Sequence, residues 1–205
     1  SAKLGIDALG YQPDQKEIML EAIRRPYGMI LVTGPTGSGK TVSLYTCLNL
    51  LNEPGINIST AEDPVEFNLH GINQVQMNSK AGMTFASGLR SVLRQDPDII
   101  AVGEIRDGET AEIAMRAAIT GHLVLSTLHT NDAVSTLDRL VDLGIEPYLI
   151  AGAVKGIVSQ RLVRKICPSC RKEYTPTQDE LDSLHIDRDT LGGRKFSRGA
   201  GCPEC

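Results

Sequence analysis

A glycine-rich stretch between two apolar segments carries the clearest chemical signal in the chain. It fits the pattern G-x-x-x-x-G-K-[ST] in full, and its eight residues are Gly34, Pro35, Thr36, Gly37, Ser38, Gly39, Lys40 and Thr41. Glycines let backbone N–H groups approach phosphate oxygens closely, and the N-terminus of the following helix adds partial positive charge. The pattern predicts a loop for the phosphates of ATP, in which Lys40 reaches the β- and γ-phosphates and the Thr41 hydroxyl ligates Mg²⁺. A turn without a ligand is the weaker alternative, because the flanking strand and helix are those that this motif requires.

Charged side chains follow three other apolar segments, at the point where each segment ends. Glu62, Asp63 and Glu66 follow residues 56–61, Glu104 and Arg106 follow residues 99–102, and His129 follows residues 123–127. In a parallel sheet ligands bind at the carboxyl ends of the strands, so these side chains are expected at the edge that carries Lys40. Asp98 precedes its strand and is expected at the opposite end. Three such loops at one edge favour a catalytic site over solvated turns.

The carboxylates of this edge have the chemistry that phosphoryl transfer to water needs. One carboxylate must orient the attacking water, and another must help to hold Mg²⁺ or its waters. We expect Glu104 to lie near Mg²⁺ and Glu62 to orient the attacking water. The sequence also allows the two residues to have the opposite roles. Glu66 is a further candidate ligand, with a pair to a basic side chain as its alternative.

The histidine and the arginine of this edge each have a functional and a structural interpretation. His129 is a candidate sensor of the γ-phosphate or of a neighbouring subunit, and its alternative is a hydrogen bond inside its own turn. Arg106 is a candidate charge clamp, and its alternative is a surface ion pair with Asp107 or Glu109.

Two C-x-x-C pairs, Cys167 with Cys170 and Cys202 with Cys205, lie about thirty residues apart. Each pair can give two thiolates to one tetrahedral Zn²⁺, and four cysteines leave no open position for catalysis. Because the chain shows no secretory signal, a reducing compartment favours metal over disulfides or free thiols. Cys47, on the helix after the glycine loop, is interpreted as a small buried apolar residue.

The spacing of apolar residues predicts the elements that position these groups. Strands are expected at residues 29–33, 56–61, 72–77, 99–102 and 123–127, and helices at 17–23, 42–51, 84–95, 109–120, 133–143, 147–158 and 177–184. Apolar strands that alternate with helices predict an α/β fold with a mostly parallel sheet covered on both faces. We therefore divide the chain into an entry segment and helix (1–26), a core domain (27–165) and a zinc-binding subdomain (166–205).

Composition narrows the range of functions. The 205 residues are 41% hydrophobic, which suits one globular domain with a small appendage. The net charge of −4, an aromatic content of 4% and the lack of tryptophan argue against a nucleic-acid partner. No apolar run approaches the ~20 residues that a membrane helix needs. The chain starts as if inside a longer protein and stops within a cysteine motif, so we expect further sequence on both sides.

The order of four motifs resembles that of the secretion-superfamily ATPases. Residues 34–41, 60–66, 103–107 and 126–132 look like the Walker A, Asp box, Walker B and His box of that family, and Glu104 matches the glutamate with which its Walker B ends. Residues 42–46 and 57–63 look most like the pilus assembly (extension) ATPase, with the type II secretion ATPase a close second. Pilus retraction ATPases lack the paired cysteine motif and rank third.

The resemblance implies a RecA-like, Mg²⁺-dependent ATPase that works as a cytoplasmic homohexamer, peripheral to the inner membrane on a platform protein. ATP hydrolysis would drive the addition of pilin, and the four cysteines would hold Zn²⁺. In this family arginines from a preceding domain close over the nucleotide, so we expect the chain alone to hydrolyse ATP slowly and to remain mainly monomeric. A nucleic-acid motor with zinc knuckles is the alternative from another class, and it would show basic or aromatic surface runs.

Overall fold

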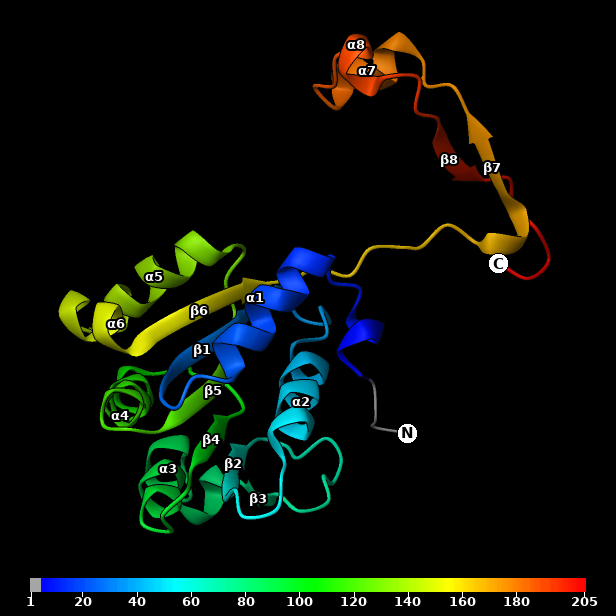
Figure 1. The fold of residues 1–205 in the computed structure, drawn as a ribbon. Coiled ribbons are helices and arrows are strands. Elements are labelled where there is room, and N and C mark those ends of the chain that lie inside the picture. Colours follow the sequence, from blue (N-terminus) through cyan, green and yellow to red (C-terminus); the bar gives the residue numbers. More distant parts are fainter. Residues whose placement is uncertain (1–4) are drawn as a thin grey trace. The chain divides into compact units, whose positions relative to one another are not determined.

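The chain forms two compact units in the computed structural model, which describes residues 5–205. The first unit ends at Leu162, and the second comprises Val163–Cys205 (Figure 1). The sequence alone places this division after residue 165.

A six-stranded sheet forms the centre of the first unit. The strands are β1 (Gly28–Thr33), β2 (Ile58–Glu62), β3 (Asn73–Gln76), β4 (Ile99–Val102), β5 (Leu123–Leu128) and β6 (Val154–Ser159). They lie in the order β3-β2-β4-β5-β1-β6, and every neighbouring pair is parallel. All residues of β1, β2, β4 and β5 are buried, which explains why β1, β4 and β5 are mostly apolar, whereas β2 also buries Ser59, Thr60 and Glu62. The expected parallel sheet is confirmed.

Helices cover both faces of this sheet (Figure 1). They are α1 (Pro13–Ile23), α2 (Lys40–Leu51), α3 (Phe85–Leu93), α4 (Gly108–Ile119), α5 (Ala133–Asp142) and α6 (Pro147–Ala153), with short 3-10 turns η1 (Ile6–Leu9) and η2 (Ser79–Ala81). Helices α1 and α2 bury their apolar residues in one core, and α3 to α6 bury theirs in a second core on the other face. Within residues 5–205, no helix combines the length and the apolar character that crossing a membrane requires.

The strand β6 is the main difference from the sequence-based assignment of elements. The segment 147–158 reads as one helix, but α6 ends at Ala153 and residues Val154–Ser159 extend along β1. Val154 lies opposite Met29, and Ser159 lies opposite Thr33. β-Branched residues and a glycine make this segment a poor helix and a good strand, and pairing with the buried β1 decides between the two. The sheet thus gains an outer strand whose end lies beside the glycine loop.

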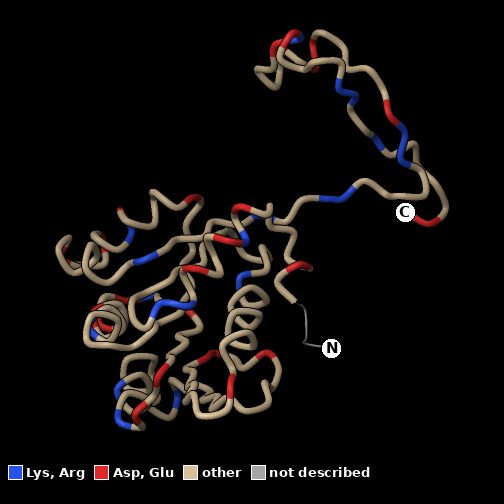
Figure 2. The backbone as a smooth tube through the Cα atoms, viewed as in Figure 1, with Lys and Arg blue, Asp and Glu red and all other residues tan. Residues whose placement is uncertain are grey.

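The second unit is a small hairpin with two short helices. Strand β7 (Arg171–Tyr174) pairs antiparallel with β8 (Phe196–Gly199), after a 3-10 turn η3 (Pro168–Cys170). The helix expected at 177–184 is present as α7 (Gln178–Ser183), and α8 (Arg188–Leu191) follows it. Lys and Arg outnumber Asp and Glu in the two strands, and Asp and Glu outnumber Lys and Arg in the two helices (Figure 2). Only Cys170, Pro176 and Leu181 are buried among residues 163–205, so this unit has a very small core.

Candidate functional site

The glycine loop joins the buried strand β1 to the helix α2, as its flanking sequence predicts. Gly34, Gly37 and Gly39 have positive φ values of 146°, 77° and 85°, which side chains with a Cβ rarely adopt. The hydroxyl of Ser38 is buried and finds no hydrogen-bond partner within the described residues. A loop of strained glycines with an orphaned buried donor fits an anion such as a phosphate, because the anion would satisfy that donor.

The ammonium group of Lys40 lies folded against its own loop. Its Nζ donates hydrogen bonds to Gly34 O at 2.9 Å and to Pro35 O at 3.1 Å, and the residue is only 8% exposed. Burial lowers the pKa of Lys40, and the negative charge of Glu104 raises it. The lysine is therefore held at the mouth of the loop by two carbonyl oxygens that a phosphate would replace.

The ring of His129 connects Lys40 to Glu104. His129 Nδ1 lies 3.5 Å from Lys40 Nζ, and His129 Nε2 lies 3.4 Å from Glu104 Oε2. Because an ammonium group only donates, Nδ1 must accept, and the ring proton then sits on Nε2 and points to Glu104. The histidine loop itself is fixed to β1, since Thr130 N donates to Thr33 Oγ1 at 3.1 Å. His129 thus contacts two residues of other motifs, in place of a bond inside its own turn.

Glu104 also forms an ion pair with Arg106, and this pair raises the pKa of the arginine. The alternative prediction for Arg106, a surface ion pair with Asp107 or Glu109, is wrong. Asp107 instead caps α4 by accepting from Thr110 N at 2.8 Å, and Glu109 pairs with Arg90 at 2.6 Å. Arg106 therefore pairs with Glu104 at the sheet edge, while Asp107 and Glu109 have other partners.

The carboxylate of Glu62 is buried in a network of neutral donors. The hydroxyls of Tyr45 and Thr60 donate to its two oxygens, and Gln74 Nε2 donates to Oε1 at 3.1 Å. Glu62 is 3% exposed, so these bonds replace the water that a carboxylate would otherwise hold. Burial, followed by the bond to Glu62, strongly raises the pKa of Tyr45, which keeps the phenol a hydrogen-bond donor.

One cavity of about 470 Å³ collects these groups at the carboxyl edge of the sheet. Its lining includes Gly37, Gly39, Lys40, Thr41, Glu62, Asp63, Glu66, Glu104 and His129. Glu66 is exposed at its rim, and its backbone N donates to the Tyr45 hydroxyl at 3.3 Å. Asp98 lies away from the cavity, where it accepts from Asn57 N at 2.7 Å. The carboxylates that follow their strands thus line the cavity, and Asp98, which precedes its strand, does not, as the sequence predicts.

Three residues of the site have no motif to mark them in the sequence. Tyr45 and Gln74 hold Glu62, and Gln160 contacts the glycine loop from the end of β6. Tyr45 reads as an ordinary core residue of α2, and Gln74 as a polar residue of a half-exposed strand. Gln160 escapes notice because its segment reads as the end of a helix. The one available signal for Tyr45 was its position on α2, if the helix had been oriented with Tyr45 facing residues 62–66.

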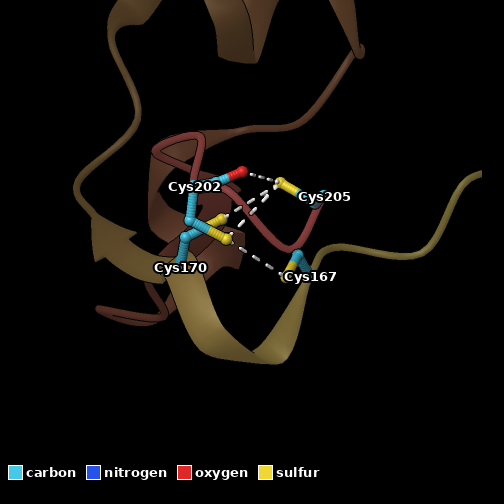
Figure 3. Close-up of side chains that lie close together, drawn as sticks. All are labelled: Cys167, Cys170, Cys202 and Cys205. Carbon is cyan, nitrogen blue, oxygen red and sulfur yellow. Dashed lines mark hydrogen bonds between the residues drawn. The ribbon is translucent and has the colours of Figure 1, made fainter.

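The four cysteines of the second unit converge on one point (Figure 3). All four Sγ atoms lie within 4.8 Å of one another, and the closest pairs are 3.7, 3.8 and 3.9 Å apart. Sulfur atoms ~2.3 Å from a central zinc form a tetrahedron with edges of roughly 3.8 Å, so the spacing fits Zn²⁺ and is far too long for disulfides. The backbone N–H of Ser169 lowers the pKa of Cys167 to about 7, which favours the thiolate form. Cys47 is separate from this cluster and fully buried in α2, as expected.

The fold defines a RecA-like α/β domain with a tetracysteine unit attached. The chain belongs to the family described as Type II/IV secretion system protein, whose profile matches residues 1–205. Among solved structures, the pilus retraction motor PilT with bound ADP has a TM-score of 0.69 at 40% identity, over 80% of this chain and 50% of PilT. The ATPase DotB of Legionella pneumophila has a TM-score of 0.64 at 27% identity, over 95% of this chain and 49% of DotB.

Curated relatives include two kinds of machine. The type IV pilus assembly ATPase PilB of Pseudomonas aeruginosa is 58% identical over the whole chain, and the type II secretion system protein E of the same organism is 51% identical. The chain spans 36% of the length of the first and 40% of the second.

Proposed function

We propose that this chain is the motor domain of a type IV pilus assembly ATPase, which hydrolyses ATP to ADP and phosphate. The observation that carries the proposal is the convergence of Lys40, Glu104 and Glu62 on one cavity beside the glycine loop. A phosphate-binding lysine, a carboxylate at the cation position and a carboxylate for water are the parts that this reaction requires. The ADP bound to PilT and the ATPase names of the relatives support the same reaction.

The residues of the cavity have separate roles in this proposal. Lys40 would leave the carbonyls of Gly34 and Pro35 for the phosphates, and Thr41 and Glu104 would hold Mg²⁺, which would supply positive charge to the phosphate oxygens. Glu62 orients the attacking water from its fixed position among three donors. His129 loses its lysine partner when Lys40 moves, so its hydrogen bonds respond to the nucleotide.

Glu66 and the tetracysteine unit complete the assignment. Glu66 is an additional ligand at the exposed rim of the cavity. The four cysteines would hold a Zn²⁺ with a structural role, because a closed tetrahedral shell would leave no position for a substrate. Four such bonds would compensate for the small core of the second unit.

The machine that the motor serves follows from the relatives rather than from the site. Identity to the pilus assembly ATPase of Pseudomonas aeruginosa exceeds identity to its secretion counterpart, and this favours pilus assembly. The protein would then act as a cytoplasmic homohexamer on an inner-membrane platform protein, without nucleic acid. The type II secretion ATPase is the alternative, with the same chemistry.

Turnover measurements on three variants test the reaction. Lys40→Ala should abolish hydrolysis, since it removes the cation that meets the γ-phosphate. Glu62→Gln should keep ATP binding and lose hydrolysis by ~10²-fold or more, because an amide orients water poorly. Glu104→Gln should in addition change the Mg²⁺ concentration needed for half-maximal rate. Normal turnover in Lys40→Ala refutes the loop assignment, and loss of turnover in Glu104→Gln alone refutes the role of Glu62.

Complementation separates the two machines. The full-length protein should restore pili to a strain that lacks its pilus assembly ATPase, and the platform protein of that system should co-purify with it. Restored type II secretion without restored pili would favour the alternative.

A further inference from the structure

The side chain of Gln160 touches the glycine loop from outside every motif of the site. Gln160 directly follows β6, and its backbone N donates to Thr33 O at 2.9 Å. This bond continues the pairing of β6 with β1 by one step beyond Ser159 and Thr33. Gln160 is therefore fixed at the position where β1 ends and the glycine loop begins.

The amide of Gln160 joins the loop to the helix α2. Its Nε2 donates to Ser38 O at 2.6 Å, and its Oε1 accepts from Ser43 Oγ at 2.7 Å. A carbonyl oxygen only accepts, so the atom that faces Ser38 must be the nitrogen and the orientation of the amide is unambiguous. Donating to one partner and accepting from the other at this spacing requires an amide.

The bond to Ser38 O determines which way the next peptide N–H points. The peptide between Ser38 and Gly39 is trans, because the one cis bond recorded for residues 5–205 is Asp63-Pro64. In a trans peptide the C=O and the N–H point in opposite directions. Holding Ser38 O toward β6 therefore turns the N–H of Gly39 away from β6 and into the loop, where a phosphate oxygen would accept from it.

The backbone of Gln160 also explains why the loop begins with glycine. A Cβ at Gly34 would lie 2.3 Å from Gln160 O, and a Cβ at Gly39 would lie 3.3 Å from Gln160 Nε2. The loop thus packs directly on Gln160 at both of its ends. We infer that Gln160 is a positioning residue for nucleotide phosphates, which it serves by holding the Ser38–Gly39 peptide in its anion-binding orientation.

Nucleotide affinity tests this inference, which rests on the proposed function. Gln160→Met keeps the length of the side chain and removes both hydrogen bonds. Because ADP and ATP share the phosphate that meets the loop, both should bind about five- to tenfold more weakly, the range of one neutral hydrogen bond. At saturating ATP the turnover should change less than about twofold, since the inference concerns binding rather than the reaction.

The matched control is Gln95→Met, which changes an exposed glutamine that follows α3 and should leave ADP affinity unchanged.

A double-mutant cycle with Ser43→Ala separates positioning from general damage. Ser43 acts here by holding the Gln160 amide, so Ser43→Ala should weaken ADP binding by about threefold in the parent and not at all in the Gln160→Met background. Equal ADP affinity in the parent and Gln160→Met overturns the inference, as does full additivity of the two changes. If Gln160→Met fails to fold, unchanged ADP affinity in Ser43→Ala alone overturns it. A parent protein that binds no ADP contradicts the proposed function instead.

Discussion

The carboxylate of Glu62 is the most constrained group of the site. Water normally solvates an ionised carboxylate, but here Tyr45, Thr60 and Gln74 take its place. Tyr45 lies on α2, the same helix that presents Lys40, and its ring packs edge-on against Phe67 with centroids 4.6 Å apart. Tyr45 therefore links the position of the Glu62 carboxylate to the helix that follows the glycine loop.

Replacement of Tyr45 by phenylalanine should slow hydrolysis without weakening ATP binding. The ring and its contact with Phe67 remain, but Glu62 loses a donor to a charged group, worth ~1.5–3 kcal/mol. We expect kcat to fall about ten- to a hundredfold, with KM for ATP nearly unchanged. Tyr174→Phe is the matched control, because Tyr174 also donates to a glutamate, Glu180, but in the second unit. A kcat of Tyr45→Phe equal to that of the control would show that the phenol does not position Glu62.

At the scale of helices and strands, the two compact units differ in how they are stabilised. Parallel strands β1, β2, β4 and β5 bring four loops to one sheet edge, and their buried residues make that edge rigid. The second unit has instead a two-stranded hairpin and two helices, whose core is too small to hold the fold by burial alone. We therefore propose that the cysteine cluster stabilises this unit.

Cys170→Ser should release the metal and unfold the second unit while the first unit survives. Elemental analysis should give about one zinc per chain in the parent and a value near zero in the variant, since three thiolates and a serine bind Zn²⁺ far more weakly. ADP affinity should stay within about twofold, because the cysteines belong to a separate compact unit. Cys47→Ser is a control for the loss of a thiol outside the cluster. Metal-free parent protein with two disulfides would contradict this prediction.

At the scale of the whole molecule, two arginines at the carboxyl edge of the sheet already have partners. Arg106 pairs with Glu104, and Arg161, which β6 brings to the same edge, donates to Asn131 O at 3.2 Å. An arginine that stabilises the transferring phosphoryl group is worth ~10³–10⁵ in rate in comparable enzymes. The chain spans 36% of the length of a pilus assembly relative, so we propose that the missing arginines come from sequence outside it.

A chain extended to the full length of its relatives should therefore hydrolyse ATP at least about tenfold faster per site than these 205 residues, and should form hexamers. The shorter chain should bind ATP and sediment mainly as a monomer. Turnover and sedimentation velocity at matched concentrations of the two proteins decide the matter. Equal turnover from a monomeric 205-residue chain would mean that its own arginines suffice.

Local sequence determines the loop, the strand-end carboxylates and the cysteine ligands. A glycine pattern between a strand and a helix needs its φ values wherever it occurs, and a charge that follows a parallel strand must lie at the carboxyl edge. These features depend on a few consecutive residues, so residues 34–41, Glu62, Glu104 and His129 are found without a structure.

Only the tertiary structure decides which groups complete the site. Residues 154–159 become a strand because β1 offers them a buried partner, whereas the sequence-based assignment extends the preceding helix through residue 158. That one pairing brings Gln160 to the glycine loop, more than a hundred residues away in sequence. Arg106 pairs with Glu104, while Asp107 caps α4 and Glu109 pairs with the distant Arg90. The contacts of Gln160 and of Arg90 join residues far apart in the chain, and no local pattern encodes them.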